Sequence, residues 1–164
     1  MSCLESLASV LRHEIDLHEA LFAAAEEKRL AIIAGDLSRM EQLLVEEHQV
    51  IDQVRVAEEK RQGLTLTACE ELGLPVRGTR LAAIAEVAPA PHGETLRGIH
   101  NTLRELIDRL RYRNRQNAEL LSASLSHVDA FMQAVGEACQ EPAGYGRDAQ
   151  VKATRMHSML DRSA

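Results

Sequence analysis

The sequence predicts an all-α fold: an elongated antiparallel helical bundle, or coiled coil, of three long helices with a short connector helix and a C-terminal tail. The 164 residues are rich in Ala, Leu, Glu, Arg and Gln, whereas β-branched and aromatic residues are too few for several strands. Apolar residues recur at steps of three and four along most of the chain, which is the period of an amphipathic helix. The longest such stretch, Thr95–Cys139, needs partner helices along its whole length, and the first half of the chain supplies them. We expect residues 1–141 to form the bundle and residues 142–164 to form a flexible or weakly helical tail.

The first long helix is expected to begin at Ser2 or Ser6 and to end at Ala34, where Gly35 interrupts the apolar repeat. Its apolar face is wide enough to pack against two neighbouring helices. His18 lies on this face, so we expect it to be a partly buried packing residue rather than a ligand.

The second long helix follows the Gly35-Asp36 junction directly. Either Asp36 or Ser38 can cap it, and Ser38 with Glu41 has the spacing of a capping box. Gly63 lies inside this helix, costs about 1 kcal/mol relative to Ala and permits a bend. The sequence Gly73-Leu74-Pro75 is a strong signal for the end of the helix.

The connector and the long third helix complete the predicted bundle. Thr79 is expected to cap a short helix over 80–87, and a Pro-containing segment, 88–93, then lets the chain turn back. The long helix ends before Pro142, and the segment 147–164 is polar with a weak apolar stripe that is too short for a stable isolated helix.

Charge and cysteine content exclude several classes of protein. The net charge is −6, divided into −8 for residues 1–75 and +2 for residues 76–164, which is the opposite of the balance of a polyanion-binding domain. Three widely spaced cysteines without a CxxC motif indicate no zinc or thioredoxin-type site and favour a reducing compartment, the cytoplasm. Neither a signal peptide nor a run of 18 apolar residues is present, so no membrane insertion is expected.

The spacing of the histidines argues against catalysis. A di-iron or di-manganese bundle site needs a Glu three residues before a His, and no Glu has that spacing. A histidine phosphotransfer bundle is a weaker alternative, because the Lys usual three residues after the phosphorylated His is absent after His13, His18, His48, His100 and His127. We therefore expect no enzymatic activity, no metal and no cofactor.

Polar residues in the long helix form two further patterns. Four arginines at alternate positions from Arg109 to Arg115 suggest a nucleic-acid patch, but on a helix they form two pairs on different faces, so we expect them to be solvated or to pair with the acidic second helix. Asn114 and Asn117 occupy positions of the apolar stripe, as register-setting polar residues do in coiled coils. The favoured interpretation is that Asn117 hydrogen-bonds across the bundle; the alternative is that the apolar partners separate there.

A series of degenerate motifs runs along the chain. In order, they are Gly35-Asp36-Leu37, Glu59-x-Arg61, Leu72-Gly73-Leu74-Pro75, Thr79…Leu81…Ile84-Ala85, Asn114-x-x-Asn117-x-x-Leu120-Leu121 and Tyr145-Gly146. Their order and spacing resemble the FlgN family of flagellar export chaperones, and the resemblance covers roughly residues 5–150.

The resemblance implies a cytoplasmic, non-enzymatic chaperone. Family members bind the C-terminal helical segments of the hook–filament junction proteins FlgK and FlgL, keep them unpolymerised and deliver them to the export gate protein FlhA. The C-terminal region of the family carries cargo binding, and a Tyr near the end contacts FlhA; Tyr145 is the matching residue here.

The residues of the distal long helix and tail are compatible with this function. We expect an adaptable apolar groove whose anchors are Leu121, Leu125, Val128, Met132, Met156 and Met159. The competing interpretation is that these side chains bury one another inside the bundle. The unequal helices also leave apolar edges compatible with a homodimer in the absence of cargo. A structural coiled-coil adaptor of another assembly remains the alternative function, and it predicts stable oligomers without a preference for flagellar cargo.

Overall fold

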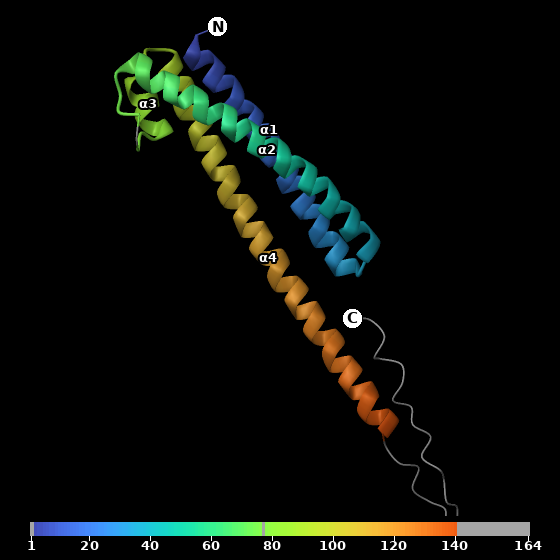
Figure 1. Cartoon of the computed structure of the whole chain (residues 1–164). Helices are drawn as coiled ribbons and strands as arrows, with labels where there is room; N and C mark the ends of the chain where they lie inside the picture. Colours follow the sequence, from blue (N-terminus) through green and yellow to red (C-terminus); the bar gives the residue numbers. More distant parts are fainter. Residues whose placement is uncertain (1, 77, 141–164) are drawn as a thin grey trace, which may run out of the picture. The chain divides into compact units, whose positions relative to one another are not determined.

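A computed structural model of the protein describes residues 2–76 and 78–140. Its elements are α1 (Cys3–Ala34), α2 (Leu37–Leu72), α3 (Leu81–Val87) and α4 (His92–Gln140), and all of the described secondary structure is helical (Figure 1). The predicted all-α class and the order of three long helices and one short helix are thereby confirmed. The chain divides into two units at His127–Val128, and each is described by itself. The predicted tail, 142–164, lies outside the described residues.

Helix α1 begins with the first of the two predicted caps. The Glu5 backbone N–H donates to Ser2 Oγ at 3.2 Å, and the Ser2 N–H donates to Glu5 Oε2 at 2.8 Å, which completes a capping box. At the other end, Gly35 has φ +67° and its N–H donates to the carbonyl groups of the last turn. This left-handed conformation favours glycine, so the predicted end at Ala34 is confirmed.

Helix α2 begins at Leu37, one residue after its cap. Asp36 Oδ1 accepts a hydrogen bond of 2.9 Å from the Arg39 N–H, so Asp36 is the cap. Ser38 lies inside the first turn, and the predicted Ser38–Glu41 capping box is wrong. The helix runs through Gly63 without interruption and ends at Gly73, whose φ is +66°.

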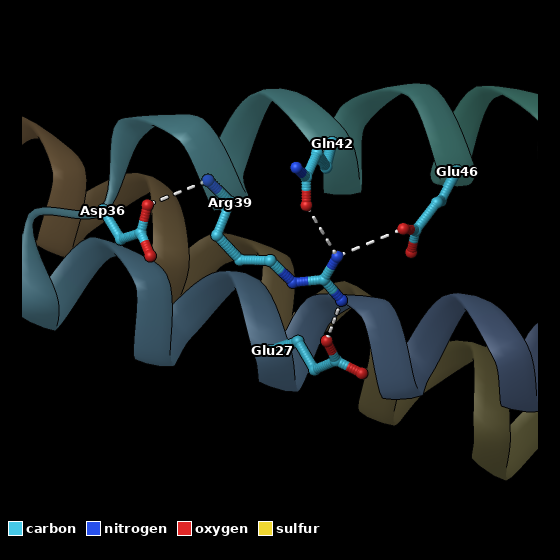
Figure 2. Close-up of polar contacts among 5 residues, drawn as sticks. All are labelled: Glu27, Asp36, Arg39, Gln42 and Glu46. Carbon is cyan, nitrogen blue, oxygen red and sulfur yellow. Dashed lines mark hydrogen bonds and ion pairs between the residues drawn. The ribbon is translucent and has the colours of Figure 1, made fainter.

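One arginine side chain joins the two helices beside their connecting turn. The Arg39 guanidinium donates to Glu27 of α1, and it also donates to Glu46 Oε1 at 3.1 Å and to Gln42 Oε1 at 3.4 Å (Figure 2). Two carboxylates raise the pKa of Arg39 above its ordinary value through these hydrogen bonds. The cluster ties α1 to the first turns of α2 at the end of the hairpin.

A buried ion pair links the middle of the same two helices. Glu14 is only 3 % exposed, and its Oε1 accepts a hydrogen bond of 3.0 Å from Arg61 Nε. Burial raises the pKa of Glu14 above its ordinary value, although Arg61 acts in the opposite direction. A second bridge, Lys28 Nζ to Glu47 Oε2 at 2.7 Å, joins the helices nearer the turn. Together these pairs fix the register of α1 on α2.

The short helix of the connector is not capped as predicted. The Thr79 hydroxyl donates to the Pro75 carbonyl, and α3 begins after Arg80 without a side-chain cap, so the predicted Thr79 cap is wrong. Helix α4 begins at His92, three residues before the predicted start. A Cβ on Gly93 would lie 2.7 Å from the Ala85 carbonyl oxygen, which explains glycine where α4 passes the end of α3.

The main hydrophobic core lies where all four helices meet, near the N-terminus of α1. Leu7, Leu11, Ile84 and Leu96 are fully buried there, and Ala68 and Cys69 of α2 complete the cluster. Farther along, Arg109 of α4 lies over Phe22 of α1, and Arg113 forms an ion pair with Glu26, so a later residue of α4 contacts a later residue of α1. Helix α4 therefore runs parallel to α1 and antiparallel to α2, as an up-down-up bundle requires.

Candidate protein-binding surface on α4

The first half of α4 is held against α1 by three contacts in succession. Arg109 lies over the Phe22 ring at 4.6 Å from its centroid, and Arg113 forms an ion pair with Glu26. One turn later, Asn117 Nδ2 donates to the Ala25 carbonyl oxygen at 2.7 Å. The arginines therefore contact α1, and the expected pairing with α2 is wrong for Arg109 and Arg113.

The two asparagines have different environments. Asn117 is 6 % exposed and hydrogen-bonds to α1, whereas Asn114 is exposed and lies outside the core. The reason is geometric, because steps of three and then four residues from Leu110 keep Arg113 and Asn117 on the face toward α1. A single step of four from Leu110 carries Asn114 to the edge of that face. Asn114 is thus not a polar core residue, contrary to the sequence-based expectation.

Beyond Asn117, six large apolar residues of α4 are exposed. Their relative exposure lies between 37 % and 67 %, and they are Leu121, Leu125, Val128, Phe131, Met132 and Val135. We call these six residues the distal stripe. Among the anchors predicted from sequence, the structure thus places Leu121, Leu125, Val128 and Met132 on one exposed helix face. Met156, Met159 and Tyr145 lie outside the described residues.

The distal stripe continues the face of α4 that contacts α1. From Asn117, steps of four and three residues lead through Leu121, Leu125 and Val128 to Met132. At about 100° per residue, these steps keep the side chains within about 80° of Asn117 around the helix axis.

The surroundings of the distal stripe consist of short side chains, several of them serines, and three acidic residues, Glu119, Asp129 and Glu137. Ser124 Oγ donates to the Leu120 carbonyl oxygen at 2.9 Å, and Ser126 Oγ to the Ser122 carbonyl oxygen at 3.0 Å. These hydroxyl groups are satisfied by their own helix, so covering the stripe leaves few polar groups to pair. No Lys or Arg occurs between residues 116 and 140. The surface is suited to an apolar partner.

The selection of anchors from sequence omitted two residues of the stripe. Phe131 and Val135 are 67 % and 41 % exposed and belong to the same apolar face. Their helical spacing was visible in the sequence, but spacing alone does not distinguish an exposed face from a buried one. The Glu14–Arg61 pair was also missed, because a Glu on an apolar stripe is recognisable as buried only when its partner is known.

Comparison with known proteins places this surface in context. The model of the FlgN family, described as FlgN protein, matches residues 1–153. The chain belongs to the FlgN family. Membership of the FlgN family implies that the protein is a flagellar export chaperone, and the chaperones of this family bind flagellar proteins. No curated protein and no solved structure gives a significant match. Among the described residues, no helix combines the length and the apolar character needed to span a membrane.

Proposed function

We propose that this FlgN-family protein is a cytoplasmic, non-enzymatic chaperone of the hook–filament junction proteins FlgK and FlgL. It binds their C-terminal helices, keeps them unpolymerised and delivers them to the export gate protein FlhA. The observation that carries the proposal is the distal stripe, a run of six exposed apolar side chains on α4. An amphipathic cargo helix is the natural complement of such a face, because it presents anchors at the same three- and four-residue steps.

The size of the stripe is sufficient for a useful complex. Burying an apolar side chain of this kind contributes roughly 1.5–3 kcal/mol, so four anchors supply on the order of 6–12 kcal/mol. Lost translational freedom and ordering of the cargo segment offset part of this gain. A micromolar complex needs about 8 kcal/mol, so micromolar affinity is within reach.

The composition of the stripe supports binding of two different cargoes. Met132 has three rotatable bonds and adapts to differently shaped neighbours. The neighbouring Ser122 and Ser124 are short and uncharged, so they impose no charge pattern on a partner. A surface of this kind favours related helices over a single sequence.

Calorimetric titration with the C-terminal segments of FlgK and FlgL from the same organism tests the proposal. We expect saturable one-to-one binding, lost when Leu125 and Met132 are replaced with Asp. Because both side chains are exposed, the double variant should keep its helicity and melting temperature. The matched control replaces Leu30 and Ile33, which are 62 % and 60 % exposed on α1, with Asp and should bind normally.

The outcomes separate the alternatives. Absence of binding to either segment by the folded protein would refute the cargo assignment and favour a structural coiled-coil adaptor. Unfolding of the Leu125/Met132 variant would show that the distal stripe is part of the core. Truncation after Glu141 examines the expected contribution of Met156 and Met159, since it should weaken binding if the tail completes the groove.

The gate contact is tested separately from cargo binding. Tyr145→Ala is expected to weaken binding of the loaded chaperone to the cytoplasmic domain of FlhA while leaving the calorimetric cargo affinity unchanged. Equal binding of the variant and the wild type to FlhA would remove Tyr145 from the proposed contact.

A further inference from the structure

The last turns of α4 combine an exposed apolar surface with negative charge. Val128, Phe131 and Met132 of the distal stripe are 57 %, 67 % and 63 % exposed. No residue between 116 and 140 is Lys or Arg, whereas three are acidic, so this part of the helix has a net charge of −3. The natural cover for such a surface is an amphipathic helix with apolar anchors and a positive net charge.

The chain itself carries a sequence with that chemistry after α4. Residues 147–164, which we call the C-terminal segment, have a net charge of +2. Their charged side chains are four basic residues, Arg147, Lys152, Arg155 and Arg162, and two acidic residues, Asp148 and Asp161. Met156, Met159 and Leu160 have the three- and four-residue steps of one helix face. A polar sequence of this length is at best a marginal helix alone in water, so an apolar surface beside it would stabilise it.

The connection between α4 and the C-terminal segment has the length of a helix-hairpin loop. Helix α4 ends at Gln140, and the following residues, 141–146, include one proline and two glycines, which favour a turn over a continued helix. Connections between neighbouring antiparallel helices commonly have about two to eight residues. As a helix, the C-terminal segment would be about 27 Å long, whereas Val128 lies only about 18 Å along α4 from Gln140. The segment is therefore long enough to run back past Val128.

The register of such a hairpin brings the apolar anchors together. With residue 147 opposite residue 140, Met156 lies opposite Phe131 and Met159 lies opposite Val128. Both facing pairs are apolar, and each includes an exposed residue of the distal stripe.

The same register also pairs opposite charges. Asp129 lies opposite residue 158, which is within one turn of both Arg155 and Arg162. Asp129 itself is exposed and borders the apolar face of α4. Apolar contacts and favourable charge contacts therefore select one alignment of the two helices.

We propose that the C-terminal segment packs as a helix on α4 of the same chain and covers the distal stripe from Val128 onward until cargo displaces it. Leu121 and Leu125 precede the covered part and stay open, so a cargo helix can begin to dock there. The cargo helix and the C-terminal segment then compete for the same apolar side chains. This inference deepens the proposed cargo function and rests on it for the displacement, but not for the cover itself.

Calorimetric cargo titration of full-length variants tests the displacement. Met156→Asp with Leu160→Asp removes two apolar anchors of the cover, so the affinity for the FlgK and FlgL segments should rise. A rise of about tenfold corresponds to a surface that is open about one tenth of the time in the wild type. The matched control, Thr154→Asp with Ser158→Asp, makes the same change in net charge on the opposite face of the same helix and should bind cargo as the wild type does.

A second measurement tests the cover without any cargo. A protein truncated to residues 1–146 keeps every buried residue of the described part, since the last of these is Asn117, so it retains its core. A synthetic peptide of residues 147–164 should bind this truncated protein saturably, and more weakly as the salt concentration rises from about 0.05 to about 0.5 M. The full-length protein should not bind the peptide, because its own segment is present at a far higher effective concentration.

Substitutions in the truncated protein locate the peptide. Val128→Asp with Met132→Asp should abolish peptide binding, because both side chains lie in the covered part of the stripe. Leu30→Asp with Ile33→Asp introduces the same charge at exposed apolar positions of α1 and should leave peptide binding unchanged. Circular dichroism should show an equal helix content in both variants before the peptide is added.

The outcomes separate this inference from the cargo proposal. Weaker cargo binding by the Met156/Leu160 variant would overturn the inference and make these side chains cargo anchors, and unchanged binding would show that cargo displaces nothing. Failure of the truncated protein to bind the peptide would exclude the cover whether or not cargo binds. If the peptide binds as expected but neither cargo segment does, the cover stands and the proposed cargo function fails.

Discussion

At the scale of single residues, Glu14 is the most unusual group in the described structure. It occupies a position of the α1 face that packs on α2, and its only strong partner is Arg61, whose side chain is 26 % exposed. A buried carboxylate of this kind contributes little net stability, because desolvation opposes the attraction to its partner. Its role is better understood as fixing the register of α1 and α2, since a shifted register would leave the charge unpaired.

The raised pKa of Glu14 predicts a particular dependence of stability on pH. The folded protein holds this proton more tightly than the unfolded chain, whose pKa is near 4.5. The contribution of Glu14 to stability is therefore fully present below that pH and is lost as pH rises through the higher pKa of the folded state. The difference in unfolding free energy between wild type and Glu14→Gln should fall as pH rises from about 4.5. Urea denaturation of both proteins at several pH values measures it, and a difference that grows with pH would show that Arg61 dominates.

At the scale of the helices, Gly63 inside α2 and Gly73 at its C-terminal cap allow the same substitution to be compared in two backbone conformations. A Cβ meets nothing within 4 Å at either Gly63 or Gly73, but only Gly73 has a positive φ, +66°. Gly63→Ala should stabilise the protein by about 0.5–1 kcal/mol, because Ala loses less entropy in a helix interior. Gly73→Ala should destabilise it by about 1 kcal/mol through left-handed strain.

Thermal or urea unfolding of these two variants and the wild type measures both effects. A loss of stability in Gly63→Ala would show that α2 needs flexibility at this position. Such a result would support the bend at Gly63 that the sequence analysis allowed, although α2 is one continuous helix in the structure.

The helices also show which features are predictable from sequence. Gly35 and Gly73 marked the ends of α1 and α2 correctly, because a left-handed residue is a local requirement. Caps were less predictable, since Asp36 and Ser38 compete for one helix start and only the three-dimensional path decides between them. For the candidate site, spacing identified the residues of the distal stripe. The spacing did not establish that these residues are exposed, because a buried apolar helix face and an exposed one have the same period.

At the scale of the whole molecule, the fold and the proposed binding surface use different parts of α4. Leu96 is fully buried in the core with Leu7, Leu11 and Ile84, whereas Leu125 is 58 % exposed. The stability of the protein should therefore depend on the first turns of α4 and be nearly independent of the distal stripe. A helix that extends an apolar face beyond its own core leaves that face available for a partner.

This separation predicts opposite results for two identical substitutions in α4. Leu96→Ala should lower the unfolding free energy by about 2–5 kcal/mol, because it leaves a cavity in the core. Leu125→Ala should change it by less than about 0.5 kcal/mol, as expected for an exposed position. Cargo affinity should show the reverse order, with Leu125→Ala weakening binding while Leu96→Ala, measured below its melting temperature, binds as the wild type does. Equal destabilisation by both variants would mean that the distal stripe belongs to the folding core, and its exposure would then no longer support cargo binding.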